Sequence, residues 1–273
     1  MFGFLFPPAA KRGEKAASRR SKAPPKRAAK PAPPRPLTVP GLDAALELRE
    51  SVRARRYTLK VDAARGLIQV VTPPAQPSGQ VLDFVVRHID WVKSRLAKTP
   101  APAPFVDGAE IPVAGDLCVI RHSVTHRGAP VLRDGALTVG GGGEFLPRRV
   151  RDWLIGRARA AIVPAAHAKA AALGVRVAGV TLRDTRSRWG SCTAAGRLSF
   201  SWRLAMAPPA VLDYVVAHEV AHLVEMNHSP RFWALCESLT ADARGGRAWL
   251  KAEGSRLFRY GQPARMRETN RST

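Results

Sequence analysis

Some segments of the chain have the hydrophobic pattern of β-strands and others have the spacing of α-helices. Together they predict a mixed α+β fold. Residues 57–62 and 67–71 are predicted to form two strands joined by a turn at 63–66, where Gly66 can adopt a positive φ. Apolar residues recur at helical spacing over 79–97, so one helix is expected there. Short strands are expected further along, at 111–121, 130–133 and 136–139.

The second half of the chain is predicted to be mainly helical around one β-hairpin. An Ala-rich helix is expected over about 145–173, with Gly174 as its C-cap. The hairpin is expected over 180–204, because its second strand alternates between apolar residues and the polar positions that include Arg203. Three further helices are expected from Pro209 to about Met226, from Pro230 through Leu239, and over about 245–257.

Composition predicts four segments. Residues 1–40 are rich in Pro, Ala, Lys and Arg and are expected to form a disordered basic tail, since they hold too little apolar surface to offset the entropy of ordering. The four glycines of 140–143 lack the strand and helix that flank a phosphate loop, so they are interpreted as a linker. The expected division is a small β-rich region with one helix at 41–140, a second domain at 141–262 and a tail at 263–273.

The chain carries a formal charge of +23, and ten Lys and Arg against one acid lie within residues 1–36. This charge allows two interpretations: a field that attracts phosphate-bearing partners, or an Arg-rich solvated surface. The tail is correspondingly either a spacer or an arm with weak affinity for polyanions. We expect a cytoplasmic protein without a membrane span, because no apolar run approaches the ~20 residues that a span needs and the three cysteines form no CxxC pair.

The helix that begins at Pro209 contains a metal-binding pattern. His218 and His222 are four residues apart and share one face of a helix, so both imidazoles can reach one ion, while Glu219 lies within reach of a water at that ion. His228 is the expected third ligand, because the helix ends near Met226 and Asn227 could take a left-handed turn. Three protein ligands plus water are typical of a catalytic zinc site, with one Zn²⁺ per chain.

This pattern predicts a zinc-dependent hydrolase in which Glu219 acts as the general base. Tyr214 lies one helical turn before His218 and is either a donor to the oxyanion or a buried helix residue. The expected substrate is a peptide or protein. The alternatives are hydrolysis of nucleotides or other phosphoanhydrides and a zinc module associated with nucleic acids, both suggested by the basic charge.

Four segments resemble the YgjP-like metallopeptidase family, which is related to the SprT-like zincins: 186–192, 200–204, 214–223 and 227–233, within a similarity that spans about 46–260. The resemblance implies a zincin-like catalytic domain that contains the HExxH helix and is preceded by a small β-containing region. It also implies that His218, His222 and His228 bind the metal and that Glu219 is catalytic. Glu225 stands where the metzincins have glycine, so a metzincin proper is not expected.

The segment around Arg188 allows a functional and a structural interpretation. Arg188 could contact an anionic group of the substrate beside Gly190, or it could pair with an acid such as Asp184 while Trp189 lies in the core. Arg203 is a second candidate for substrate contact. Cys192 could serve as a fourth ligand, which would make the zinc site structural.

Overall fold

The computed structural model describes residues 35–37, 45–62, 67–97, 101–185 and 188–262. The predicted turn at 63–66, most of the predicted N-terminal tail and the C-terminal tail at 263–273 lie outside these residues. The described chain divides between Ala101 and Pro102 into two units, each with its own hydrophobic core. Among the described residues, no helix combines the length and the apolarity that crossing a membrane requires.

The N-terminal unit contains a four-stranded sheet of order β1-β2-β4-β3, made of Arg35–Leu37, Ala45–Glu50, Leu67–Thr72 and Thr58–Asp62 in that order. β3 and β4 pair antiparallel as expected, whereas β1 lies within the segment predicted to be disordered. Alternate residues of β4 are buried, and they belong to a core that contains Leu46, Ile68, Val70, Val81, Val85 and Val92.

The single helix predicted over 79–97 is two helices, α1 (Ser78–Arg87) and α2 (Ile89–Ala97). They are separated by His88, whose φ of −111° and ψ of 16° are not helical. Its ring Nδ1 lies 2.8 Å from the carbonyl oxygen of Phe84, so the side chain satisfies a backbone group at the break. Apolar periodicity continues across the break, which is why the sequence pattern predicts one helix.

The predicted domain boundary at 140 is wrong, because the second sheet belongs to the C-terminal unit. This sheet has the order β5-β6-β8-β7, from Glu110–Val113, Asp116–Ser123, Ala136–Gly140 and Val131–Arg133. Ile120, Leu137 and Val139 are fully buried in the same core as helix α3 (Leu146–Ala172). The glycines of 140–143 end β8 and enter a short 3-10 turn, η1 (Gly143–Phe145), so they connect two parts of one core.

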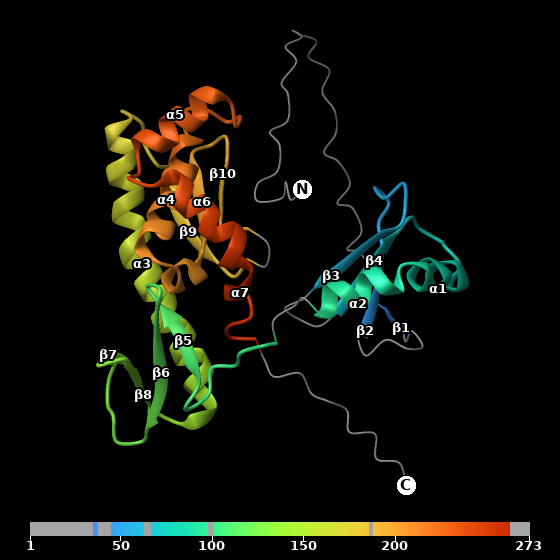
Figure 1. Cartoon of the computed structure of the whole chain (residues 1–273), viewed down its shortest axis with the longest axis horizontal. Coiled ribbons are helices and arrows are strands. Elements are labelled where there is room, and N and C mark those ends of the chain that lie inside the picture. Colours follow the sequence, from blue (N-terminus) through green and yellow to red (C-terminus); the bar gives the residue numbers. More distant parts are fainter. Residues whose placement is uncertain (1–34, 38–44, 63–66, 98–100, 186–187, 263–273) are drawn as a thin grey trace, which may run out of the picture. The chain divides into compact units, whose positions relative to one another are not determined.

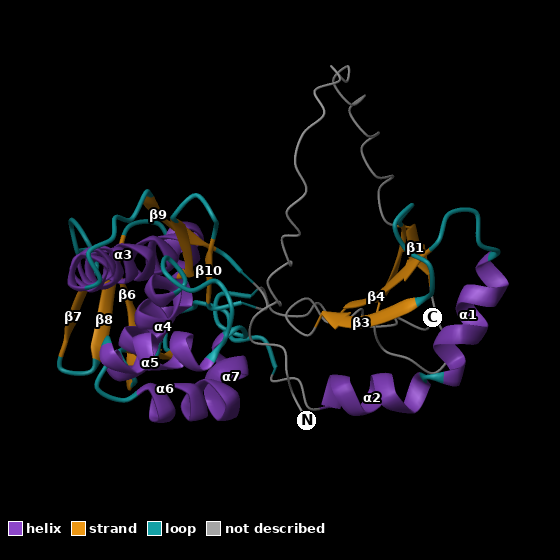
Figure 2. Cartoon of the chain, turned by 90° about the horizontal axis from the view of Figure 1, so that it is seen from above, coloured by secondary structure: helices purple, strands orange, loops and turns teal. Residues whose placement is uncertain are grey.

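Helix α3 packs along its length against the rest of this unit (Figures 1 and 2). Its fully or nearly fully buried residues recur every four positions, which gives one continuous apolar stripe from Leu146 to Ala170. Gly174 follows with a φ of +67°, as expected for a C-cap.

The predicted hairpin of 180–204 is a three-stranded sheet of order β10-β11-β9. β10 (Gly190–Cys192) pairs antiparallel with β11 (Arg197–Ser201), and β9 (Gly179–Arg183) pairs with β11 in parallel on the other side. The chain leaves the strand at Trp202 and forms a 3-10 turn, η2 (Trp202–Met206), in which every residue is buried. The alternation expected through 204 therefore ends at 201, and Arg203 is buried instead of solvent-facing.

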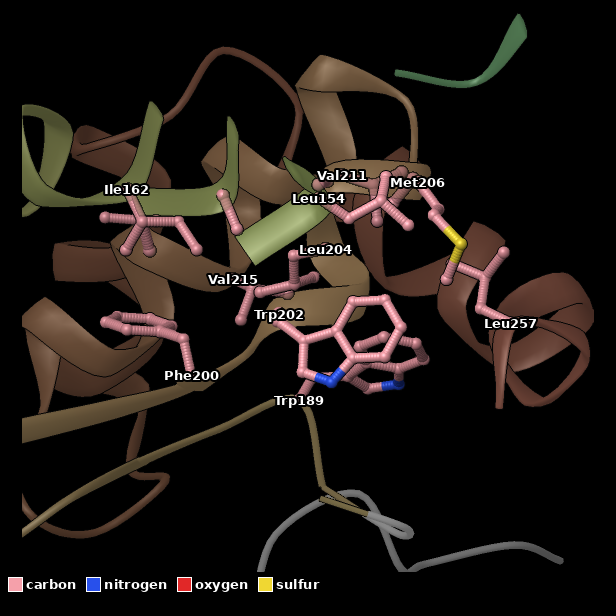
Figure 3. Packing of buried hydrophobic residues seen from close by; sticks show 14 of the residues in the cluster. Leu154, Ile162, Trp189, Phe200, Trp202, Leu204, Met206, Val211, Val215 and Leu257 are labelled. Carbon is pink, nitrogen blue, oxygen red and sulfur yellow. The ribbon is translucent and has the colours of Figure 1, made fainter. Parts of the chain in front are cut away.

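The remaining helices of this unit follow the third sheet in the chain and contribute buried residues to the same core. They are α4 (Pro209–Ala221), α5 (Pro230–Ser238), α6 (Ala243–Trp249), a π-helical turn η3 (Leu250–Gly254) and α7 (Ser255–Leu257). Figure 3 shows part of the core, where Trp189, Phe200 and Trp202 from the sheet region pack with Val211 and Val215 of α4. The structure thus confirms the mixed α+β class.

Candidate metal centre

Helix α4 is a core helix that carries buried polar residues. All residues from Tyr214 to Ala221 are buried, so this part of the helix is surrounded by protein on all sides. His218 and Glu219 are fully buried, and His222, which is 8% exposed, is the C-cap residue. Burying a polar side chain is unfavourable unless it gains a partner or a function.

The chain reverses directly after α4 and brings His228 back to the helix. The predicted end near Met226 is five residues too late, because the helix ends at Ala221 and the backbone tightens, with Leu223 N–H donating to Val220 O at 2.9 Å. Asn227 is not among the described residues with positive φ, so the expected left-handed turn is wrong. Ser229 fixes the exit, because its side chain accepts a hydrogen bond from Phe232 N at 3.3 Å and caps α5.

His218, His222 and His228 each offer a ring nitrogen, and these atoms lie within 4.8 Å of one another. Within the described ranges they are the group of His, Cys, Asp and Glu residues whose geometry could hold a metal ion, and Cys192 is not part of it. The Nε2 atoms of His218 and His228 are 3.1 Å apart. Two nitrogens bound to one tetrahedral ion at about 2.1 Å would be roughly 3.4 Å apart, so the pair fits a zinc-sized ion.

The protonation of the histidines also suits ligation. Burial, followed by the neighbouring His222 and His228, lowers the pKa of His218 to about 2, and burial lowers the pKa of His222 and His228 as well. All three rings are therefore neutral near pH 7 and have lone pairs available. His222 Nδ1 lies 3.1 Å from the carbonyl oxygen of Glu225, which can only accept, so Nδ1 carries the proton and Nε2 is free to bind an ion.

Glu219 is the buried acid of the site. Neither carboxylate oxygen has a hydrogen-bond partner among the described residues, and burial raises the pKa of the carboxyl to about 8. A carboxylate in this state is suited to an ion or a water placed beside it, because either one would supply the missing interaction. The orphaned oxygens are thus a second observation, independent of the histidines, that fits a metal centre.

Gly190 explains how Glu219 is accommodated. A Cβ atom at Gly190 would lie 2.4 Å from Glu219 Oε1 and 2.5 Å from its Cγ, distances at which one group must move. The absence of a side chain at Gly190 thus permits the close approach of Glu219 from α4. Trp189 beside it is 4% exposed and its ring lies 4.6 Å from that of Phe258, which confirms the interpretation of Trp189 as a core residue.

Tyr214 lies next to the histidines in the core. It is 1% exposed, its ring is 5.9 Å from the ring of His218, and its hydroxyl has no hydrogen-bond partner among the described residues. Burial raises the pKa of the phenol. A Cβ at Gly246 would lie 2.6 Å from Tyr214 Cβ, so α6 packs closely against this residue. These contacts match the interpretation of Tyr214 as a buried helix residue.

The two arginines considered from the sequence differ in their surroundings. Arg203 is 1% exposed, and its guanidinium donates to Asp184 Oδ1 and, at 3.3 Å, to Tyr260 O. The acid Asp184 thus pairs with Arg203 and not, as one interpretation expected, with Arg188. Arg188 is exposed, and its carbonyl oxygen accepts a hydrogen bond from Thr185.

A further arginine near the site was missed. Arg247 of α6 has its guanidinium carbon 4.8 Å from the ring centroid of Trp233, and that ring lies 5.8 Å from the ring of His228. Its positive charge contributes to lowering the pKa of both His218 and His228, after burial. No local sequence pattern marks Arg247, because only the packing of α6 against α4 places it there.

Comparison with protein-family models identifies one match, the YgjP-like metallopeptidase domain, over residues 55–253. Searches of curated proteins and of solved structures found no match. The matched range covers most of the chain and includes the three histidines, Glu219, Gly190 and Arg247. The chain therefore belongs to the YgjP-like metallopeptidase family.

Proposed function

We propose that this protein is a zinc-dependent peptidase in which His218, His222 and His228 hold the ion and Glu219 is the general base. The observation that carries the proposal is the cluster of three neutral histidine nitrogens together with Glu219, a buried carboxylate on the same helix whose oxygens have no hydrogen-bond partner among the described residues. This constellation, with three protein ligands, leaves a position for water and substrate, as catalytic zinc sites do. The proposed fold of this part is zincin-like.

Zinc, when bound, supplies a Lewis acid and lowers the pKa of a water from 15.7 to about 7. Glu219 would take a proton from the water that attacks the scissile carbonyl, and the same carboxyl would then deliver that proton to the leaving amine. Its apolar surroundings favour this exchange, because burial brings the two protonation states of the carboxyl closer in free energy near neutral pH. Gly190 leaves room for the carboxylate, because a Cβ there would lie 2.4 Å from Glu219 Oε1.

Strand β10 is the proposed edge strand with which an extended substrate pairs. β11 lies in the middle of its sheet, between β10 and β9, so it offers no open edge to a substrate. β10 is an edge strand, and its first residue, Gly190, touches Glu219. Main-chain pairing with β10 would align a scissile carbonyl with the histidines, which is how an edge strand can both bind and orient a peptide.

The phosphoanhydride alternative gains no support from the site. It requires several cations that converge on the ion. Arg203 is buried and paired with Asp184, so its guanidinium is not available to a phosphate. The nucleic-acid alternative depended on the basic tail and on net charge, and most of that tail lies outside the described residues.

The test combines metal analysis with turnover. Purified full-length protein is expected to carry about one zinc per chain and to cleave casein or short peptides, and any of the three histidines changed to Ala is expected to lose most of the metal. Glu219→Gln is expected to keep the zinc and to reduce turnover by about 10²–10⁴-fold.

Nucleoside triphosphates are tested in parallel. Full zinc occupancy in His228→Ala would remove His228 from the ligand set. Near wild-type rates in Glu219→Gln would show that Glu219 is not the base, and hydrolysis of triphosphates without cleavage of any peptide would overturn the peptidase proposal.

A further inference from the structure

Arg247 is held next to the metal centre by two features of α6. Asp242 caps the helix by accepting a hydrogen bond from Gly245 N at 2.7 Å. Gly246 lets the helix approach α4 so closely that any side chain there would collide with Tyr214. The backbone next to Arg247 is therefore fixed relative to the helix that bears His218 and Glu219.

The guanidinium is also fixed, by an aromatic ring. It lies 4.8 Å from the centroid of the Trp233 ring, a distance at which the cation is attracted to the ring face. Trp233 belongs to α5, and its ring is 5.9 Å from the His218 ring and 5.8 Å from the His228 ring. One aromatic side chain thus connects the cation with two of the histidines.

The charge of Arg247 has no acidic partner among the described residues. The ion pairs there join other residues, and Arg247 itself is exposed to solvent. Arg203 provides the contrast, because that guanidinium is buried and satisfied by Asp184. An exposed, immobilised guanidinium with unused donors is suited to bind a planar anion with two parallel hydrogen bonds.

We infer that Arg247, stacked on Trp233, is a specificity residue that binds a carboxylate of the peptide substrate beside the metal centre. The inference rests on the proposed function, since it assigns a substrate class to the same site. A peptide offers two sources of this group, its C-terminal carboxylate and an acidic side chain. The guanidinium reaches either source with the same chemistry, and it places the peptide so that a nearby bond lies at the histidines.

Binding is measured separately from cleavage, in the zinc-loaded full-length Glu219→Gln protein. Calorimetry compares three short peptides of one sequence: one with a free C-terminal carboxylate, one fully amidated, and one amidated with a single Gln replaced by Glu. At least one carboxylate peptide is expected to bind about tenfold or more tightly than the amidated, Gln-containing peptide, because hydrogen bonds to charged groups are the stronger ones. The peptide that gains identifies the source.

Adding Arg247→Gln is expected to reduce that preference to less than about twofold while the zinc content stays unchanged, and Arg247→Lys is expected to retain part of it. Arg244→Gln, on the same helix, is the matched control and should keep the full preference. Equal binding of all three peptides, or a preference that persists in Arg247→Gln because the ion itself holds the carboxylate, would overturn the inference.

The same peptides are then offered to the protein with Glu219 intact. A carboxylate preference that depends on Arg247, without cleavage of any peptide, would leave the binding site in place and refute the peptidase proposal. Cleavage of all three peptides with equal KM would do the opposite: it would support the proposed function and contradict the role of Arg247.

Discussion

Two regions of the C-terminal unit bury charged or ionisable groups. In one region the buried group has hydrogen-bond partners, and in the other it has none among the described residues. Around Arg203, the guanidinium donates to Asp184 and to the Tyr260 carbonyl and stacks 4.3 Å from the Trp202 ring centroid. Burial alone would raise the pKa of Asp184, but the hydrogen bond and charge of Arg203 lower it below its ordinary value. The charges in this region are matched.

Around Glu219 the opposite holds. The carboxylate is fully buried, neither oxygen has a partner within the described part of the chain, and its pKa is raised by burial alone. The fold thus supplies Arg203 with a carboxylate and a carbonyl acceptor, whereas the described residues supply no hydrogen-bond partner for either oxygen of Glu219. The contrast teaches that a satisfied buried charge makes the fold sensitive to the loss of its partner, whereas an unsatisfied one retains free energy for interaction with a ligand.

The largest expected effect on stability comes from breaking the ion pair between Arg203 and Asp184. Arg203→Met should lower the free energy of unfolding by about 3 kcal/mol, because it removes the hydrogen bonds that connect Asp184 and Tyr260. Asp184→Asn should cost a similar amount, because it leaves the buried guanidinium of Arg203 without its anionic partner. Urea denaturation of zinc-loaded protein measures both. An Arg203→Met protein as stable as wild type would show that this pair does not stabilise the fold.

The outcome for Arg203 also shows where sequence reasoning stopped. The HExxH helix, its two histidines and His228 follow from short-range spacing, so they could be predicted. The alternation over 197–204 placed Arg203 on an open face, but the 3-10 turn at Trp202–Met206 rotates it into the core, and no local signal marks that turn. The boundary at 140 failed for a similar reason, since glycines marked a turn and the core continued beyond it.

The next largest effect is on turnover and comes from a change beside Glu219. Gly190→Ala introduces a Cβ at 2.4 Å from Glu219 Oε1, so the carboxylate must move away from its position in the site. Turnover should fall by about 100-fold, equivalent to about 2.7 kcal/mol in the barrier, while the zinc content stays near one per chain. Gly179→Ala in β9 is the control, because a Cβ there meets nothing within 4 Å. Similar rates for the two variants would contradict the positioning of Glu219 by β10.

A smaller effect appears in the pH dependence of metal-free stability. The folded pKa of Glu219, about 8, lies above its ordinary value of 4.5, so its contribution to stability is present at low pH and is lost as pH rises toward 8. The histidines act in the opposite sense, since their pKa values are lowered and their contribution is lost as pH falls below 6.5. Metal-free stability should therefore be highest near pH 6.5.

Between pH 6.5 and 8 the acid is the group of the site whose contribution to stability declines, so Glu219→Gln should remove a decline of at most about 2 kcal/mol. Thermal unfolding of the metal-free proteins at the two pH values measures this difference. Zinc-loaded wild type should lack the decline, because the dication keeps the carboxylate ionised. An equal decline in Glu219→Gln would assign it to another group.

The smallest expected effect is a difference in zinc affinity between variants of two helix caps of similar chemistry. Ser229 caps α5 directly after His228, and Asp242 caps α6, which bears none of the three histidines. Each changed to Ala should cost about 1 kcal/mol of stability. Only Ser229→Ala should also weaken zinc binding, by roughly tenfold, because the cap fixes the direction in which the chain leaves His228. Competition with a chelator measures the affinity, and equal losses in the two variants would mean that zinc binding follows general stability and not the geometry of this one turn.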